Sequence, residues 1–175
     1  MIVENLKTAV AQRIALDTVP DSNNMSAAEP ILRDIPTLKK GKYRKLTPML
    51  EQRFKMCGRW LHATHGTWLS LADMEMLWDD PVQDNLVRAL KYQAEAARDN
   101  WPNHAYGLFR AERLSLFAAS DLGNESIFLL WLDFEEEPEV WVYDSNGESR
   151  YANLDEYLLA YISDDLSASE RSWRA

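Results

Sequence analysis

The segment from Leu116 to Ile162 most constrains the fold, because two strand-like runs, a turn signal and an amphipathic helix follow one another in it. Ile127 to Leu132 is an uninterrupted apolar run of strand length, typical of a strand buried on both faces. Val140 to Tyr143 is rich in β-branched and aromatic residues, and the Asn146-Gly147 pair after it favours a two-residue hairpin turn. We therefore expect a central strand, then a hairpin whose returning strand is Glu148 to Tyr151.

The spacing of apolar residues then changes to that of a helix. One stripe of this helix is formed by Leu154, Tyr157, Leu158, Tyr161 and Ile162. Asn153 is the expected N-cap, since its side chain can accept the backbone N–H of Glu156, and Glu156 can reach back as in a capping box.

Earlier parts of the chain show further helical and extended patterns. We expect helices at Ile2 to Leu16, Pro48 to Leu61 and Val82 to Arg98, a short extended piece and a Ser70-capped helix between Trp68 and Trp78, and a strand or turn at Leu114 to Phe117. At 175 residues and 46% hydrophobic content, one domain is the default. The fold class expected is α+β, a single antiparallel sheet of about four to six strands flanked by helices. We divide the chain into a helix-and-loop extension (1–45), an α+β domain (46–163) and a polar tail (164–175).

Charge is unevenly distributed along the chain. The net charge is −9, with +5 in residues 1–60 and −14 in residues 61–175. An acidic field repels nucleic acid, attracts basic partners and accelerates their association. We expect no nucleic-acid ligand, and we interpret the basic cluster from Lys39 to Lys45 as a solvated first turn before a helix.

Carboxylates concentrate between the two strand-like runs. This acidic stretch contains Asp133, Glu135, Glu136, Glu137 and Glu139. Consecutive glutamates on a turn point to opposite sides, so they do not converge as an acid/base pair or a divalent-cation site. Two interpretations remain, a solvated hairpin loop and a docking surface for Arg and Lys side chains. Asp79 and Asp80 would extend such a surface if the helices fold back to the same side.

Candidates for catalysis or metal binding are weak. Cys57, His62 and His65, with His104 as a fourth ligand, could approach one another, but their spacing matches no paired-ligand motif. We interpret them as a buried thiol and partly exposed histidines. The sequence contains no glycine-rich phosphate loop, serine elbow or His-Glu-x-x-His motif. We expect no catalytic activity, cofactor or metal.

Membrane and export signals are also missing from the sequence pattern. No apolar run approaches the roughly twenty residues that cross a bilayer. Glu4 interrupts the first segment, which has no long apolar region of a secretory signal. The expected location is the cytoplasm, with no membrane contact.

The order of these elements resembles the SUKH superfamily. The segments that carry the resemblance are LFAASD at Leu116 to Asp121, IFLLWLDF at Ile127 to Phe134, PEVWVYD at Pro138 to Asp144 and YANLDEYLLAYI at Tyr151 to Ile162. Upstream, Gly66 to Leu71 and Met74 to Trp78 resemble the family's short strand and following helix, and Tyr43 to Leu50 its entry helix. The resemblance covers roughly two thirds of the chain.

SUKH proteins are best known as bacterial immunity proteins that neutralise contact-delivered toxins, and the superfamily includes fungal cell-wall-synthesis regulators. The resemblance implies a non-catalytic immunity protein that covers the active surface of a cognate toxin. Nuclease toxins are typically basic because they hold phosphates, so the acidic residues named above, Asp79 and Asp80 included, are the expected contacts. The alternative is a regulatory or scaffold module of the same fold without a toxin partner.

Overall fold

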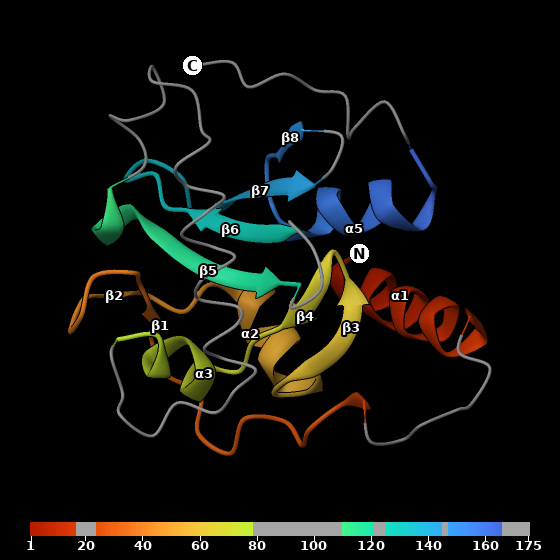
Figure 1. Cartoon of the computed structure of the whole chain (residues 1–175), viewed down its shortest axis with the longest axis horizontal. Helices are drawn as coiled ribbons and strands as arrows, with labels where there is room; N and C mark the ends of the chain where they lie inside the picture. Colours follow the sequence, from red (N-terminus) through yellow and green to blue (C-terminus); the bar gives the residue numbers. More distant parts are fainter. Residues whose placement is uncertain (17–23, 79–109, 121–124, 145–146, 166–175) are drawn as a thin grey trace.

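A six-stranded antiparallel sheet forms the centre of the computed structural model, which describes residues 1–16, 24–78, 110–120, 125–144 and 147–165 (Figure 1). Its strands are β3 (Trp60–Thr64), β4 (Gly66–Trp68), β5 (Leu114–Ala119), β6 (Ser126–Leu130), β7 (Glu139–Asp144) and β8 (Gly147–Tyr151), and they are neighbours in that order. Each strand therefore pairs with the strand that precedes it in the described chain, as in a meander. The α+β class and the expected strand number are confirmed.

β6 lies inside the sheet, between β5 and β7. The side chains of Ile127, Phe128, Leu129 and Leu130 are 0% exposed, as the uninterrupted apolar run predicts. Phe128 pairs with Trp141 of β7 across the ladder, so two large aromatic side chains are direct cross-strand neighbours. The prediction of a central strand is confirmed.

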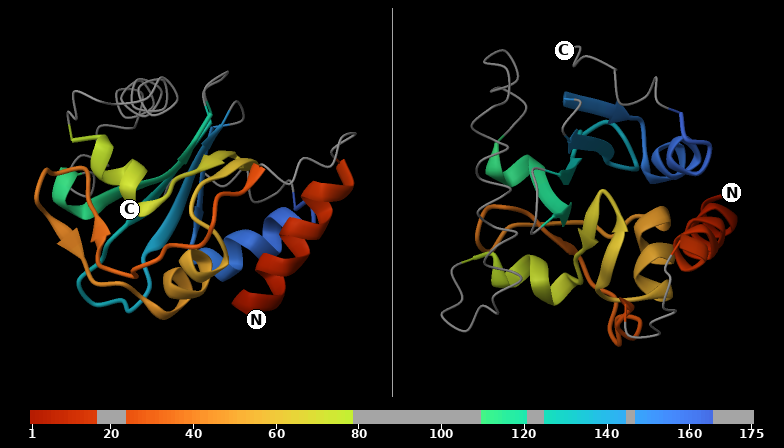
Figure 2. Two further views of the ribbon diagram at one scale, coloured as in Figure 1. Left: turned by 90° about the horizontal axis from the view of Figure 1, so that it is seen from below. Right: turned by 45° about the vertical axis from the view of Figure 1, so that its right-hand side comes forward.

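Helices cover the sheet. These are α1 (Ile2–Leu16), α2 (Pro48–Met56), α3 (Leu71–Met76), the 3₁₀ turn η3 (Ala111–Arg113) and α5 (Leu154–Ile162). α1, α2 and α5 stack on one side of the sheet, whereas α3 lies with the two-stranded sheet of β1 (Ile35–Pro36) and β2 (Tyr43–Arg44) (Figure 2). None of the helices in the described ranges is long and apolar enough to cross a membrane.

Two helix caps follow the sequence prediction. The Asn153 side chain accepts the backbone N–H of Glu156 at 3.0 Å and starts α5. Ser70 caps α3 through a reciprocal box with Asp73, in which each side chain accepts the backbone N–H of the other residue.

The N-terminal 45 residues contribute to the same hydrophobic core as the sheet. Leu6 and Ala9 of α1 are buried against the rest of the core, and Ile35 of β1 is 0% exposed. Asn5 donates to the carboxylate of Asp155 at 2.8 Å, which ties α1 to α5. The described parts of this extension, residues 1–16 and 24–45, therefore belong to the packed structure.

α2 is shorter than the sequence pattern predicts. It ends at Met56, and Trp60 and Leu61 belong to β3. The cause is a close crossing at Gly58, where a Cβ would lie 2.6 Å from Ser26 Oγ and 2.9 Å from the Ala27 carbonyl oxygen. The chain must pass extended against this segment, so tertiary packing overrides the helical spacing.

The β7–β8 hairpin is confirmed with a shifted boundary. Gly147 pairs with Asp144, so β8 begins one residue earlier than expected. Asn146 and the helix predicted at Val82 to Arg98 lie outside the described residues, as does most of the polar tail.

Candidate partner-binding site

The acidic loop, residues 131–138, connects β6 to β7 as the sequence predicts. It faces the segment that joins β2 to α2, and a groove of about 520 Å³ lies between them. Asp133, Glu135 and Glu136 line this groove opposite Arg44 and Lys45. Three of the sequence-predicted contact residues therefore share one surface feature.

Asp133 is held by two arginines. Its Oδ1 lies 3.2 Å from Arg44 Nη1, and its Oδ2 lies 3.1 Å from Arg113 Nη2. The Asp133 side chain is 63% exposed, so each pair contributes little to stability by itself. The two ion pairs instead fix the position of the loop, because they tie it to β2 and η3. They also compensate the negative charge of Asp133.

Glu137 caps α2 from a distant part of the chain. Its carboxylate accepts the Thr47 hydroxyl at 2.5 Å and the backbone N–H of Met49 at 2.9 Å. Thr47, the N-cap residue, makes no side-chain cap of its own, so Glu137 satisfies an N–H group of the first turn. Partial burial raises the pKa of Glu137, and the two hydrogen bonds oppose that shift.

Glu139 forms a bidentate ion pair within the sheet. Arg150 Nε lies 2.6 Å from Glu139 Oε2, and Arg150 Nη2 lies 2.7 Å from Oε1. The Arg150 guanidinium also lies 5.1 Å from the ring centroid of Trp141. Glu139 therefore stabilises the β7–β8 pairing and is not available as a free docking charge.

Glu135 and Glu136 remain exposed, and no ion pair to another described residue is found for either. Phe134 precedes them with a side chain that is 81% exposed. We call Phe134, Glu135 and Glu136 the loop tip. The acidic loop thus separates into anchored carboxylates and a tip that presents one aromatic ring and two carboxylates that form no ion pair with the described residues.

The remaining predicted residues do not join the loop tip. Asp79 and Asp80 lie outside the described residues. Cys57 is buried beside Arg53, His62 is exposed, and His65 lies against Tyr157 and Asp144. Within the described ranges, no three His, Cys, Asp or Glu side chains are arranged to hold a metal ion.

Sequence reasoning missed Phe134 as a surface residue. We assigned it to the end of a strand motif, but β6 ends at Leu130 and the ring lies beyond the sheet. The only signal was its position between Asp133 and Glu135, where an apolar side chain has acidic neighbours on both sides.

Comparisons of the chain with protein-family models, curated proteins and solved structures found no match. The SUKH resemblance therefore rests on the sequence motifs and stays a prediction.

Proposed function

We propose that the chain is a non-catalytic cytoplasmic immunity protein that binds and neutralises a cognate bacterial toxin, a basic protein of the nuclease type. The observation that carries this proposal is the loop tip. Its neighbours Asp133 and Glu137 are bonded to β2, η3 and α2, while Glu135 and Glu136 remain exposed for a partner.

The anchoring supports binding because it fixes the tip before a partner arrives. A loop held at both ends loses little conformational entropy on association, which favours affinity. Phe134 supplies an exposed aromatic side chain of the type enriched at interface centres. Glu135 and Glu136 supply acceptors for arginine and lysine, and the charge of −14 in residues 61–175 steers a basic partner toward the molecule.

The absence of catalysis in this proposal is supported by the surroundings of Cys57 and His65. Cys57 is buried, and burial raises the pKa of its thiol, which disfavours the nucleophilic thiolate. Both ring nitrogens of His65 already face protein groups, Tyr157 and Asp144. A general base for a substrate would need one of those nitrogens free.

A regulatory or scaffold module without a toxin partner is the second candidate. The same loop tip would bind a basic regulatory protein, so the two candidates differ in the partner and not in the surface. Genetic context separates them, because an immunity protein is encoded beside the toxin that it neutralises.

The direct test is growth rescue. The toxin domain encoded by a neighbouring reading frame is expressed with and without this chain, and we expect growth only in its presence. The absence of a toxin domain nearby, together with failure of the chain to protect against related toxins, would remove the immunity function and leave the regulatory alternative.

A charge-reversal experiment tests the surface. With the toxin domain as the probe, the double variant Glu135→Lys/Glu136→Lys should slow association and flatten its dependence on salt. The matched control, Glu4→Lys/Glu156→Lys, changes the net charge equally at exposed positions on α1 and α5. Equal slowing of association in both variants would show that association depends only on the net charge of the protein. The loop tip would then not be the interface.

A further inference from the structure

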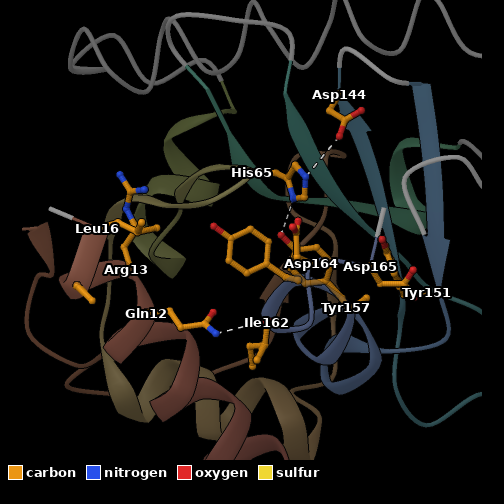
Figure 3. Close-up of a pocket in the computed structure, with 13 residues that line it drawn as sticks. Gln12, Arg13, Leu16, His65, Asp144, Tyr151, Tyr157, Ile162, Asp164 and Asp165 are labelled. Atoms are coloured by element: carbon orange, nitrogen blue, oxygen red, sulfur yellow. Dashed lines mark hydrogen bonds and ion pairs between the residues drawn. The ribbon is translucent and has the colours of Figure 1, made fainter. Parts of the chain in front are cut away.

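A second cavity, of about 610 Å³, lies where the C-terminal ends of α1 and α5 meet the turn between β3 and β4 (Figure 3). It involves none of the loop-tip residues, and its volume is in the range of small-molecule sites. Its walls come from five elements, α1, α5, β7, β8 and the β3–β4 turn, so the cavity is a product of the tertiary fold.

The floor of the cavity is aromatic. The rings of Tyr157 and Tyr161 lie 5.9 and 5.8 Å from the His65 ring, and Tyr151 lies 5.4 Å from Tyr157, all measured between centroids. Leu16 of α1 completes an apolar wall. Rings and aliphatic groups of this kind favour a ligand with an apolar part, and aromatic faces attract cations.

A hydrogen-bonded chain holds this floor in place. His65 Nε2 lies 3.4 Å from Asp144 Oδ2, and His65 Nδ1 lies 2.8 Å from the Tyr157 hydroxyl (Figure 3). That hydroxyl donates to Thr64 Oγ1 at 2.7 Å. Burial raises the pKa of Tyr157 well above its ordinary value, so the hydroxyl stays protonated. His65 and the Tyr157 hydroxyl already have hydrogen-bond partners, which suits binding better than proton transfer.

The rim of the cavity is acidic. α5 ends in a Schellman arrangement, in which Asp165 N donates to the Ala160 carbonyl at 3.0 Å and Asp164 N to the Tyr161 carbonyl at 3.2 Å. Asp164 has φ 49°, in the left-handed region that usually holds glycine at this position. Two carboxylates therefore follow the negative end of a helix dipole, where cations are favoured.

Acidic side chains outnumber basic ones among the described residues that line the cavity. They are the carboxylates of Asp144, Asp164 and Asp165, against the guanidinium of Arg13. A cationic ligand gains from this field, whereas an anion would be repelled.

We propose that this cavity binds an organic cation, an alkylammonium or alkylguanidinium group. The charge lies among the rim carboxylates, which accept its N–H groups, and the alkyl chain packs on Tyr161 and Leu16. The proposal is independent of the loop tip and of any toxin.

Calorimetric titration of the full chain tests the proposal with isosteric probes. Butylguanidinium and butylammonium should bind, whereas neutral butylurea and anionic valerate should bind at least about tenfold more weakly. Butylurea matches butylguanidinium in shape, so equal binding of the two would overturn the proposal, as would the absence of binding by either cation.

Variants locate the site. Asp164→Asn/Asp165→Asn should weaken butylguanidinium binding about tenfold, whereas Glu135→Gln/Glu136→Gln, with the same change in net charge, should leave it unchanged. Ala15→Trp, at an exposed position on the cavity wall, should block binding without a change in the fold. Equal effects of the two carboxylate pairs, or undiminished binding in Ala15→Trp, would refute a site here.

The source of the cation is resolved by one further probe. N-acetylarginine N-methylamide carries the same guanidinium on a peptide unit. If it binds as tightly as butylguanidinium, the natural ligand is a side chain of a protein; if only butylguanidinium binds, the natural ligand is a free small cation. Both results support the site and assign its occupant.

Discussion

The Glu137 carboxylate accepts the backbone N–H of Met49 at 2.9 Å, across 88 residues of sequence. This contact couples the start of α2 to the loop that leaves β6. It satisfies a donor in the first turn of the helix and restrains the loop next to its exposed tip. Helix stability and loop geometry therefore depend on the same side chain.

Glu137→Ala should lower the free energy of unfolding by about 1–2 kcal/mol, because the Met49 N–H and the Thr47 hydroxyl lose their acceptor. Glu136→Ala is the control, since its side chain is exposed beside the same loop, and it should change stability by less than about 0.5 kcal/mol. Urea unfolding followed by circular dichroism measures both. Equal losses in the two variants would show that the cap contributes nothing.

The pH dependence of stability should reveal the raised pKa of Glu137. Burial raises it above the ordinary value of 4.5, so between those two pKa values the folded state binds more protons than the unfolded state. The contribution of Glu137 is therefore fully present below pH 4.5 and is lost as the pH rises through the folded pKa.

Comparison with Glu137→Gln isolates this residue, because glutamine mimics the neutral carboxyl and the other titrating groups are shared. We expect the variant to gain stability relative to the wild type as the pH rises from 4 to 7, by an amount that solvent screening of the half-exposed carboxyl keeps small. A relative loss over that interval would mean that the hydrogen bonds from Thr47 and Met49 outweigh burial.

Arg53 is 0% exposed and organises the turn after α2. Its guanidinium donates to the carbonyl oxygens of Cys57, Gly58 and Leu69, the last at 3.0 Å, and lies over the Phe54 ring at 4.4 Å.

Arg53→Met fills a similar volume but leaves three carbonyl groups without a donor. We expect it to lower the free energy of unfolding by about 3–5 kcal/mol. Lys55→Met, on the exposed side of the same helix, should cost less than about 0.5 kcal/mol. Similar denaturation midpoints for the two variants would contradict this prediction. They would show that the cost of burying the Arg53 charge cancels the stabilisation from its hydrogen bonds.

Gly66 and Gly41 form a matched pair for a test of backbone packing. Both have positive φ angles, 88° and 73°. A Cβ on Gly66 would lie 2.4 Å from the Ala119 carbonyl carbon, whereas a Cβ on Gly41 meets nothing within 4 Å. Gly41→Ala should cost about 1 kcal/mol from the backbone alone, and Gly66→Ala about 1–3 kcal/mol more from the collision. Equal melting temperatures for the two variants would contradict the close β4–β5 approach.

Sequence patterns predicted the helices and strands that are determined by residues close to them in the sequence. The apolar run that starts at Ile127 predicts a buried strand, which the structure forms as far as Leu130, because only apolar side chains fit on both faces. Asn153 predicts a helix start because its cap partner is three residues away. α2 could not be bounded in this way. The helix ends at Met56, Cys57 is extended, and Gly58 passes close to Ser26 and Ala27, a contact that the spacing of apolar residues does not reveal.

The candidate site was also predicted only in those features that depend on neighbouring residues in the sequence. The sequence located the acidic loop but could not separate its carboxylates by role, since Asp133 and Glu137 find their partners on β2, η3 and α2. The sequence does not distinguish the roles of consecutive glutamates, although Glu137 caps a helix and Glu136 is exposed. The second cavity could not be predicted from the sequence either, because it forms only where α1 and α5 meet the turn between β3 and β4.

Phe134 and the two glutamates beside it should contribute to different steps of partner binding. If the proposed partner covers the exposed Phe134 ring, Phe134→Ser removes apolar area that the complex would bury, so it should speed dissociation from the proposed toxin domain and leave association nearly unchanged. Leu159→Ser, at a 52% exposed position on α5, is the control and should alter neither rate. Surface plasmon resonance at two salt concentrations separates the steps, because Glu135→Lys/Glu136→Lys acts mainly on association and loses its effect at high salt, while the effect of Phe134→Ser persists. If Phe134→Ser left the dissociation rate unchanged, the ring would lie outside the interface, and the loop tip would act through its charge alone.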